Sequence, residues 1–321
     1  MFSKHQKQYQ IFVVFFNHYR FHCFIVKNDN GLILLKRVAE KFDILTPEYY
    51  GFRYQSTCEN NQWKWLNLSK SVIHQVKENN SKVLFSIRFA DPAPHHIEDL
   101  FARHYLYLQS LYMMMVYDYK FSREILEIIY SHILQINYGD YSDDMKYIVQ
   151  NEFDDALLFK NVLSKYKLLK GNIPVQSELF TLVLFSKHPL YNLQVYESTF
   201  DGVPQLLGLN HRGVSVLTDR LDIKYTIPWV LLVEVRVIKD ICILTLKNIN
   251  FSSLRIVQYL SPSIEQLFKE INVDNKKQKS KYIELFFKFK TQPIASDFVT
   301  DCIQIYSFYN GYVDTKRNLN K

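Results

Sequence analysis

The sequence predicts an α+β protein with three successive parts: a small unit of strands and one helix, an all-helical unit, and a strand-rich barrel closed by a helix. The spacing of apolar residues carries this prediction, because it is near two up to residue 91, near 3.6 over 97–188, and near two again after Pro189. A chain of 321 residues is also too long for one ordinary core. Hydrophobic residues make up 48% of it, with only 8 Gly and 9 Pro, a composition that excludes disorder for most of the chain.

The first part reads as two strands, a helix and further strands. Residues 9–26 are expected to form these two strands, because β-branched and aromatic residues fill 11–16 and 21–26, with a turn between them. Asn30-Gly31 is expected to open a helix, and short strands are expected at 49–55, 63–66 and 83–89. Pro92 and Pro94 then end the unit, because successive prolines cannot continue a strand ladder. This order is that of a β-grasp fold.

The second part is expected to be helical throughout. The predicted buried face of its first helix is formed by Leu100, His104, Leu108, Leu111 and Met115. Ser122 is expected to cap the next helix, which Gly139-Asp140 ends, and whose predicted stripe is Ile125, Ile128, Ile129, Ile133 and Ile136. Further helices are expected over 154–169 and 173–188. The triplet 113–115 of methionines is interpreted as core filling rather than as a docking surface.

The third part returns to strands. They are predicted at 194–198, 205–210, 214–218, 224–229, 231–238, 241–247 and 255–260, with turn residues between them. A helix is expected from Ser261-Pro262 onward, with Ile264, Leu267, Phe268 and Ile271 on one face. Seven strands and a closing helix are typical of a small PH/PTB-like barrel.

Charge and cysteine usage narrow the class of protein. The formal net charge of +7 and the pI near 8.9 favour acidic partners, or else a diffuse excess with no patch. Cys23, Cys58, Cys242 and Cys302 lie far apart without a CxxC pair, which favours a reducing compartment over a disulfide framework or a zinc site. The N-terminus has no signal-peptide pattern, and the apolar stretch 105–119 is shorter than the ~20 residues that cross a bilayer.

Several motifs, in this order and at these spacings, resemble those of one family. Tyr49-Tyr50-Gly51-Phe52 and Trp65-Leu66-Asn67-Leu68-Ser69-Lys70 are similar to Tyr-Phe-Gly-Leu and Trp-Leu-Asp-x-x-Lys segments of FERM domains. We interpret Gly51 as a site of close backbone approach and Trp65 as a core residue. Arg103 to Gln109, Gln135 to Tyr141, Leu207-Gly208-Leu209 with Gly213, and Pro228-Trp229 resemble later FERM segments. Two departures are Ala102, where the family has Thr, and the missing Cys-x-x-His-His-x-Phe ending, replaced by 270–274.

The resemblance implies a fold of three lobes. They are a ubiquitin-like lobe over 9–91, an acyl-CoA-binding-protein-like helical lobe over 95–190, and a PH/PTB-like lobe over 192–290, with a tail of unpredicted structure over 291–321. It implies a non-catalytic membrane–cytoskeleton adaptor, cytoplasmic and peripheral at the plasma membrane or cell cortex. The implied partners are cytoplasmic tails of membrane proteins, anionic phospholipid of the inner leaflet, and cytoskeletal or cell-junction proteins. The alternative is the FERM targeting region of a larger tyrosine phosphatase, whose catalytic domain would be absent from this chain.

No catalytic, metal or cofactor site is predicted. His22-Cys23 begins like a phosphatase loop, but Asp29 stands where the phosphate-binding arginine is needed. His95-His96 with Glu98 and Asp99 is interpreted as a solvated linker, because adjacent histidines are expected to point apart. The aromatic residues fall at core-periodic positions, so nucleic-acid binding is not predicted.

Two surfaces are candidate binding sites. Basic residues are the candidates for contact with anionic lipid: Lys64, Lys70, Lys276, Lys277, Lys279 and Lys281. The other surface is a peptide groove between the fifth barrel strand and the closing helix, where an extended tail would add as a strand. The candidate groove residues are Leu232, Glu234 and Arg236 on the strand and Ile264, Leu267 and Phe268 on the helix, with Glu234 and Arg236 on the exposed side.

Overall fold

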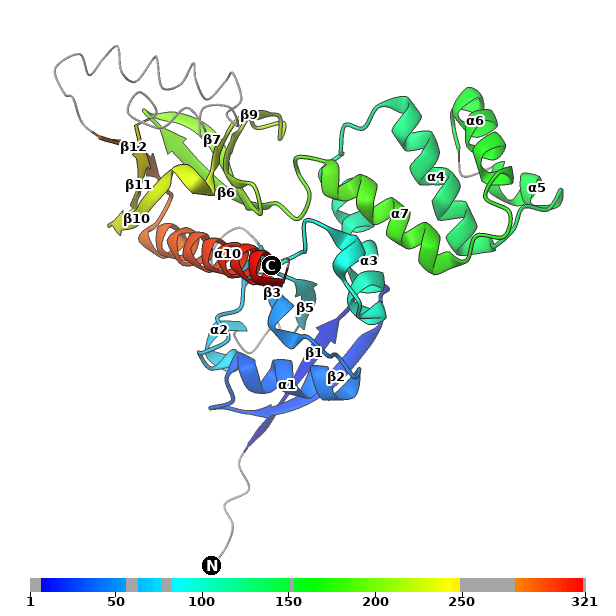
Figure 1. Ribbon diagram of the computed structural model, residues 1–321. Coiled ribbons are helices and arrows are strands. Elements are labelled where there is room, and N and C mark those ends of the chain that lie inside the picture. The colour runs from blue at the N-terminus through cyan, green and yellow to red at the C-terminus, as the bar shows by residue number, and fades with distance from the viewer. Residues whose placement is uncertain (1–6, 56–62, 77–81, 151–152, 249–280, 320–321) are drawn as a thin grey trace, which may run out of the picture. The chain divides into compact units, whose positions relative to one another are not determined.

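In the computed structural model, residues 7–55, 63–76, 82–150, 153–248 and 281–319 are described. They fall into two compact units, residues 1–191 and 192–321. The first unit contains a β-grasp lobe and a helical lobe, and the second contains a β-sheet lobe with one long helix (Figure 1). The order of elements is therefore the one that the apolar spacing predicts.

The β-grasp lobe is a five-stranded sheet with one main helix. Its strands are β1 (Gln8–Val14), β2 (Arg20–Val26), β3 (Tyr50–Gln55), β4 (Trp63–Trp65) and β5 (Lys82–Ile87), in the order β2-β1-β5-β3-β4. Helix α1 (Gly31–Lys41) begins where the sequence predicts, because the side chain of Asn30 accepts a hydrogen bond from the Ile33 amide at 3.1 Å. Its buried Leu34, Leu35 and Val38 lie in the lobe core, and a short helix α2 (Val72–Val76) precedes β5.

Gly51 and Trp65 form a local packing feature of this lobe. A Cβ at Gly51 would lie 3.1 Å from the Trp65 ring, so the expected close approach is confirmed. Trp65 itself is only half-buried, which corrects its interpretation as a core residue. Trp65 belongs to β4, an edge strand of the described sheet. The guanidinium groups of Arg53 and Arg88 lie 4.5 and 5.3 Å from its ring centroid, so both make cation–π contacts with it.

The helical lobe contains five helices. They are α3 (Leu100–Val116), α4 (Arg123–Tyr138), α5 (Met145–Gln150), α6 (Ala156–Lys167) and α7 (Pro174–Lys187). Ser122 caps α4, and Gly139 ends it with φ of +76°, as the sequence predicts. Ile129 of the predicted α4 stripe is fully buried, whereas the other isoleucines of that stripe are half-buried.

The predicted buried face of α3 is wrong. Leu100 and Met115 are 59% and 70% exposed, and the helix buries the opposite side, which carries Tyr105, Leu106 and Gln109. The reason is a polar contact with the β-grasp lobe that apolar spacing does not reveal. Gln109 accepts from the Ile87 amide at 2.8 Å and donates to the Ile87 carbonyl at 2.9 Å, and the Tyr105 hydroxyl donates to the Phe85 carbonyl at 2.6 Å. These two side chains therefore join α3 to β5.

The motif from Gln135 to Tyr141 forms the end of α4 and the turn after it, and two of its side chains make the hydrogen bonds that hold this turn. The Gln135 amide donates to Asp140 at 2.9 Å and to the Asn172 carbonyl at 2.8 Å. The Asp140 carboxylate also accepts from the Gly171 amide at 2.8 Å, and these bonds lower its pKa, the one from Gln135 most strongly. The motif thus joins the end of α4 to the connection between α6 and α7.

The second unit is a seven-stranded antiparallel sheet with a long helix. Its strands are β6 (Gln194–Phe200), β7 (Val203–Asn210), β8 (Gly213–Leu217), β9 (Ile223–Pro228), β10 (Leu232–Ile238), β11 (Ile241–Lys247) and β12 (Tyr282–Lys288). The described strands are ordered β10-β11-β12-β6-β7-β8-β9, so β10 and β9 are the two edges of the sheet as far as it is described. The predicted strand 255–260 and the helix from 261 lie outside the described residues.

Helix α10 (Gln292–Leu319) occupies the tail for which the sequence analysis predicts no structure. It contacts β10, β11 and β7, and Figure 1 shows it running alongside these strands. Ile294, Phe298, Cys302 and Ile305 repeat every three or four residues and are buried against the sheet. In the described chain, α10 is the helix that covers the sheet.

Candidate functional site: a strand edge, scattered lysines and a carboxylate pocket

The edge strand β10 is the first candidate site. Its described neighbours in the sheet are confined to β11, to which it pairs from Leu232↔Leu246 to Ile238↔Ile241 with an irregularity between Leu232 and Glu234. The register places Val235 and Val237 opposite Leu244 and Cys242, which are buried, while Glu234 and Arg236 are exposed. The strand therefore has one side toward the core and α10, and the other toward solvent.

The exposed charges of β10 are paired within the sheet. A guanidinium nitrogen of Arg236 lies 2.6 Å from Glu284 of β12, and another lies 3.8 Å from Glu234. Such exposed pairs contribute at most about 1 kcal/mol to stability. Leu232 is half-buried at the start of the strand. Of the predicted groove residues, the structure thus places the three strand residues at a sheet edge, whereas Ile264, Leu267 and Phe268 lie outside the described residues.

Helix α10 provides the neighbouring wall for this edge. The Tyr306 ring lies 5.9 Å from that of Trp229, which directly precedes β10. Trp229 is held in turn by a hydrogen bond from its indole nitrogen to the Asn210 carbonyl at 3.0 Å. The sequence analysis does not predict α10. Apolar residues recur every three or four positions from Ile294 to Tyr309, and this helical spacing is a signal that could have revealed the helix.

The predicted lipid-binding lysines are distributed over both units and the residues outside the description. Lys64 lies in β4 and Lys70 in the turn before α2, both in the first unit, while Lys281 is exposed directly before β12 in the second unit. Lys276, Lys277 and Lys279 lie outside the described residues. A shared basic face stays a prediction.

The structure shows the environment of Cys23 and of the His95-His96 pair. Cys23 is buried in β2, and burial raises the pKa of its thiol, which disfavours the thiolate that a nucleophile requires. The rings of His95 and His96 lie 4.0 Å apart, so the expectation that they point apart is wrong. The reason is that Pro94–His96 forms a 3₁₀ turn rather than a strand. Among the described residues, no group of three His, Cys, Asp or Glu side chains is arranged to hold a metal ion.

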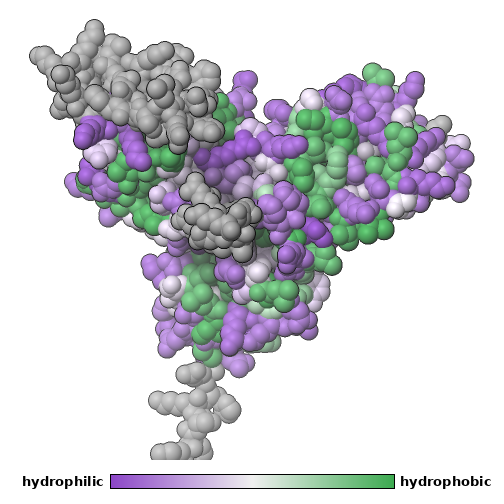
Figure 2. Space-filling view, viewed as in Figure 1, coloured by the Kyte–Doolittle hydropathy of each residue, from purple (hydrophilic) through white to green (hydrophobic). Residues whose placement is uncertain are grey.

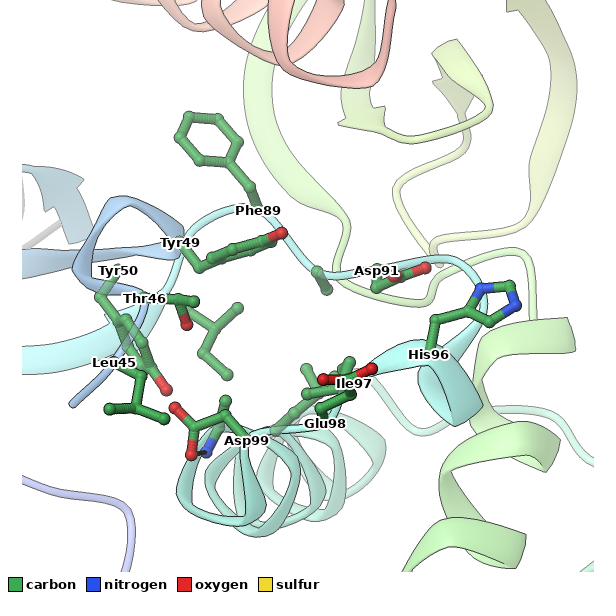
Figure 3. A pocket seen from close by; sticks show the side chains of 14 residues that line it. Leu45, Thr46, Tyr49, Tyr50, Phe89, Asp91, His96, Ile97, Glu98 and Asp99 are labelled. Atoms are coloured by element: carbon green, nitrogen blue, oxygen red, sulfur yellow. Dashed lines mark hydrogen bonds between the residues drawn. The ribbon is translucent and has the colours of Figure 1, made fainter. Parts of the chain in front are cut away.

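A pocket in the first unit was not predicted. It has a volume of about 280 Å³ and lies between the β3 side of the β-grasp lobe and the start of α3 (Figure 3). Its walls are formed by Leu45, Thr46, Tyr49, Tyr50, Ile87, Phe89, Ala90, Asp91, His96, Ile97, Glu98, Asp99, Ala102 and Leu106. Two adjacent acidic residues, Glu98 and the helix-capping Asp99, are visible in the sequence. Nothing in the sequence shows that the β-grasp lobe packs beside them.

Apolar surface is also visible over the helical lobe in Figure 2. Ile173, Val175 and Phe180 of the α7 region are 56%, 38% and 46% exposed. The Phe180 ring is covered in part by that of His132, with ring centroids 4.5 Å apart. The helical lobe thus offers a hydrophobic face, but its composition specifies no ligand.

One ion pair within the helical lobe depends on pH. His104 of α3 lies 2.9 Å from the buried carboxylate of Glu178 in α7, and this hydrogen bond raises the pKa of His104. A histidine with a raised folded-state pKa contributes stability that is fully present below its unfolded pKa of about 6.5 and is lost as the pH rises through the folded value.

We therefore expect His104→Gln to destabilise the first unit more at pH 5.5 than at pH 8.5. Thermal unfolding of both proteins across this range measures the difference. His74→Gln is the matched control, because His74 is an exposed residue of α2 in the same unit. A difference between His104→Gln and the parent that is constant with pH would contradict the expected role of the ion pair.

Comparisons with known proteins agree with this architecture. Residues 13–78 match the FERM N-terminal domain family. Human Band 4.1-like protein 3 is 26% identical over 227 residues, which cover 68% of this chain and 21% of that protein. Mouse Protein 4.1 is 26% identical over 216 residues, covering 65% of this chain and 25% of that protein.

The chain thus spans about a quarter of these curated relatives. Among solved structures, the complex of the FERM and C-terminal domains of Drosophila Merlin aligns with a TM-score of 0.74 at 14% identity, covering 96% of this chain and 98% of that one. This likeness concerns the fold, and it extends over all three lobes. No described helix is long and apolar enough to cross a membrane.

Proposed function

We propose that this chain, a FERM domain by its fold and by its N-terminal lobe, is a non-catalytic adaptor that links cytoplasmic tails of membrane proteins to the cell cortex. The observation that carries the proposal is the position of β10, an edge strand beside α10. An extended tail would add to this edge as a strand, through main-chain hydrogen bonds. The proposal places the protein at the membrane periphery.

The side chains of β10 suit such a ligand. Val235 and Val237 are half-buried on the core side, so an added strand would extend an existing apolar surface. Glu234, Arg236 and Glu284 form a mixed-charge row on the solvent side. A row of this kind discriminates between tails by their charges more than it contributes to affinity.

Anionic phospholipid is a further part of the proposal. Exposed Lys70 and Lys281 and the net charge of +7 support attraction to an acidic leaflet. Each lysine near such a surface contributes about 1 kcal/mol, so binding by a few lysines is reversible and sensitive to salt. Tail binding at β10 does not depend on it.

The test uses a panel of cytoplasmic juxtamembrane peptides from single-span membrane proteins, with affinity measured by fluorescence anisotropy. We expect Val233→Glu to weaken binding of the selected peptide about tenfold, because a charge enters the apolar edge of β10. Val233 is 46% exposed, so this change should leave stability nearly unaltered. Val203→Glu is the matched control, because Val203 is 58% exposed on β7, an interior strand.

Hydrogen exchange then locates the bound peptide. An added strand should slow exchange of the amides of 232–238 and leave those of β8 unchanged. Equal losses of affinity in the two valine variants, or protection confined to other strands, would contradict binding at β10.

A further inference from the structure

Two buried polar atoms of the pocket in the first unit have no hydrogen-bond partner among the described residues. The Tyr50 hydroxyl is buried and makes no hydrogen bond, although the residue is only 1% exposed. Oδ2 of Asp99 is likewise buried and without a partner. Figure 3 shows both groups at the same end of the pocket, with the hydroxyl pointing toward the carboxylate. A buried polar atom without a partner costs free energy, so these two atoms mark a place where a ligand would be stabilised.

Helix capping uses only one of the two carboxylate oxygens of Asp99. Oδ1 accepts from the Phe101 amide at 2.9 Å and from the Ala102 amide at 3.3 Å, as expected of an N-cap. The other oxygen makes neither of these bonds, and Asp99 is among the residues that line the pocket. The capping role fixes the carboxylate rigidly, which is a requirement for selective binding.

The charge of the walls specifies the sign of the ligand. Asp91, Glu98 and Asp99 line the pocket, whereas the described wall residues include no lysine or arginine and their basic member is His96. Burial, Asp91 and Glu48 raise the pKa of the neighbouring Tyr49, in keeping with a negative environment. Leu45, Ile97 and Leu106 supply apolar surface beside these acids.

The volume specifies the size of the ligand. Pockets for drug-sized molecules have volumes of about 300–1,000 Å³. At about 280 Å³, this one fits a single long side chain. We propose that the pocket binds an arginine side chain of a partner peptide, with the guanidinium between the Tyr50 hydroxyl and the Asp99 carboxylate and the stem against the apolar wall. A guanidinium carries five donors and no acceptor, which matches a site made of acceptors.

This site is independent of the β10 edge. It lies in the first unit, and none of its wall residues belongs to the second unit. Failure of arginine to bind here would leave tail binding at β10 unaffected, and the reverse also holds. The two proposals therefore have separate tests.

The probe is Nα-acetyl-arginine amide added to the full chain, with binding followed by ligand-observed NMR. The control ligand is Nα-acetyl-citrulline amide, which has nearly the same shape without the charge. We expect the arginine compound to bind at least about tenfold more tightly than the citrulline compound, as for a ligand that makes charge-assisted hydrogen bonds.

Two substitutions locate the site. Asp99→Asn removes the charge but keeps an N-cap residue of equal quality, so α3 should stay folded while affinity falls about tenfold. Tyr50→Phe removes only a hydroxyl without a partner, so the fold should be retained while affinity falls about threefold. Asp155→Asn is the matched control, because Asp155 caps α6 in the same way, through the Leu157 and Leu158 amides at 2.9 Å each, outside the pocket.

The outcomes are decisive. Binding that is lost in Asp99→Asn and Tyr50→Phe but unchanged in Asp155→Asn supports the site. Absence of arginine binding, equal binding of citrulline, or equal losses in the two aspartate variants overturns it.

Discussion

Replacing Gly213 with alanine is expected to destabilise the second unit by about 4 kcal/mol. Gly213 has φ of +142°, a conformation that side chains with a Cβ rarely adopt. A Cβ there would also lie 1.9 Å from the Ile227 carbonyl oxygen, which belongs to the paired strand β9. Because the obstructing atom is backbone, relief requires that β8 and β9 separate at this point.

Trp229 is a convenient reporter of this loss. It is the only tryptophan in residues 192–321, so the ¹⁹F NMR signal of 5-fluorotryptophan at this position follows unfolding of the second unit in urea. Gly202→Ala is the control in the same unit, because Gly202 has φ of +78° but no atom within 4 Å of the added Cβ. We expect that control to cost only about 1–2 kcal/mol. Equal costs at the two glycines would contradict the role assigned to the backbone contact.

Truncating Phe298 to alanine is expected to cost about 3–5 kcal/mol in the same urea experiment. The side chain is fully buried in α10, and its ring lies 5.2 Å from both Tyr196 and Phe289. The change leaves a cavity beneath the helix that the sheet cannot fill without losing its own packing. The effect measures how much α10 contributes to the sheet lobe.

Ile303→Ala is the control on the same helix. Ile303 is 51% exposed, and alanine is a better helix former, so its replacement should change stability by less than about 0.5 kcal/mol. If Phe298→Ala were equally mild, α10 would be an attachment to the sheet rather than part of its core. The proposed tail site would then lack a firmly packed wall on the α10 side.

The order of lobes was predictable because it depends on the spacing of apolar residues. Periods of two and 3.6 distinguish strands from helices over long segments, and caps such as Asn30 and Ser122 set where helices begin. Turn residues act in the same local way: Asp201 and Gly202, between the predicted strands 194–198 and 205–210, both have positive φ.

Contacts between lobes were not predictable by the same means. The face of α3 was assigned to apolar residues, whereas its buried side includes Gln109 and Tyr105, which bind the main chain of β5. The partner of a buried polar side chain lies in another part of the sequence, so periodicity gives no sign of it. The same holds for the pocket, because Tyr50 of β3 and Asp99 before α3 are far apart in the sequence and lie close together only in the folded chain.

The bonds from Gln109 and Tyr105 to Ile87 and Phe85 have a practical consequence for expression of shorter pieces. The sequence predicts that the ubiquitin-like lobe ends at the prolines 92–94, so a fragment designed from the sequence would end there. The two carbonyls and the amide on its last strand would then meet solvent, beside aromatic surface that Tyr105 covers in the intact chain. The smallest fragment that keeps these groups satisfied includes both lobes and ends near Tyr191, whose hydroxyl reaches back to the Asp91 carbonyl at 3.2 Å.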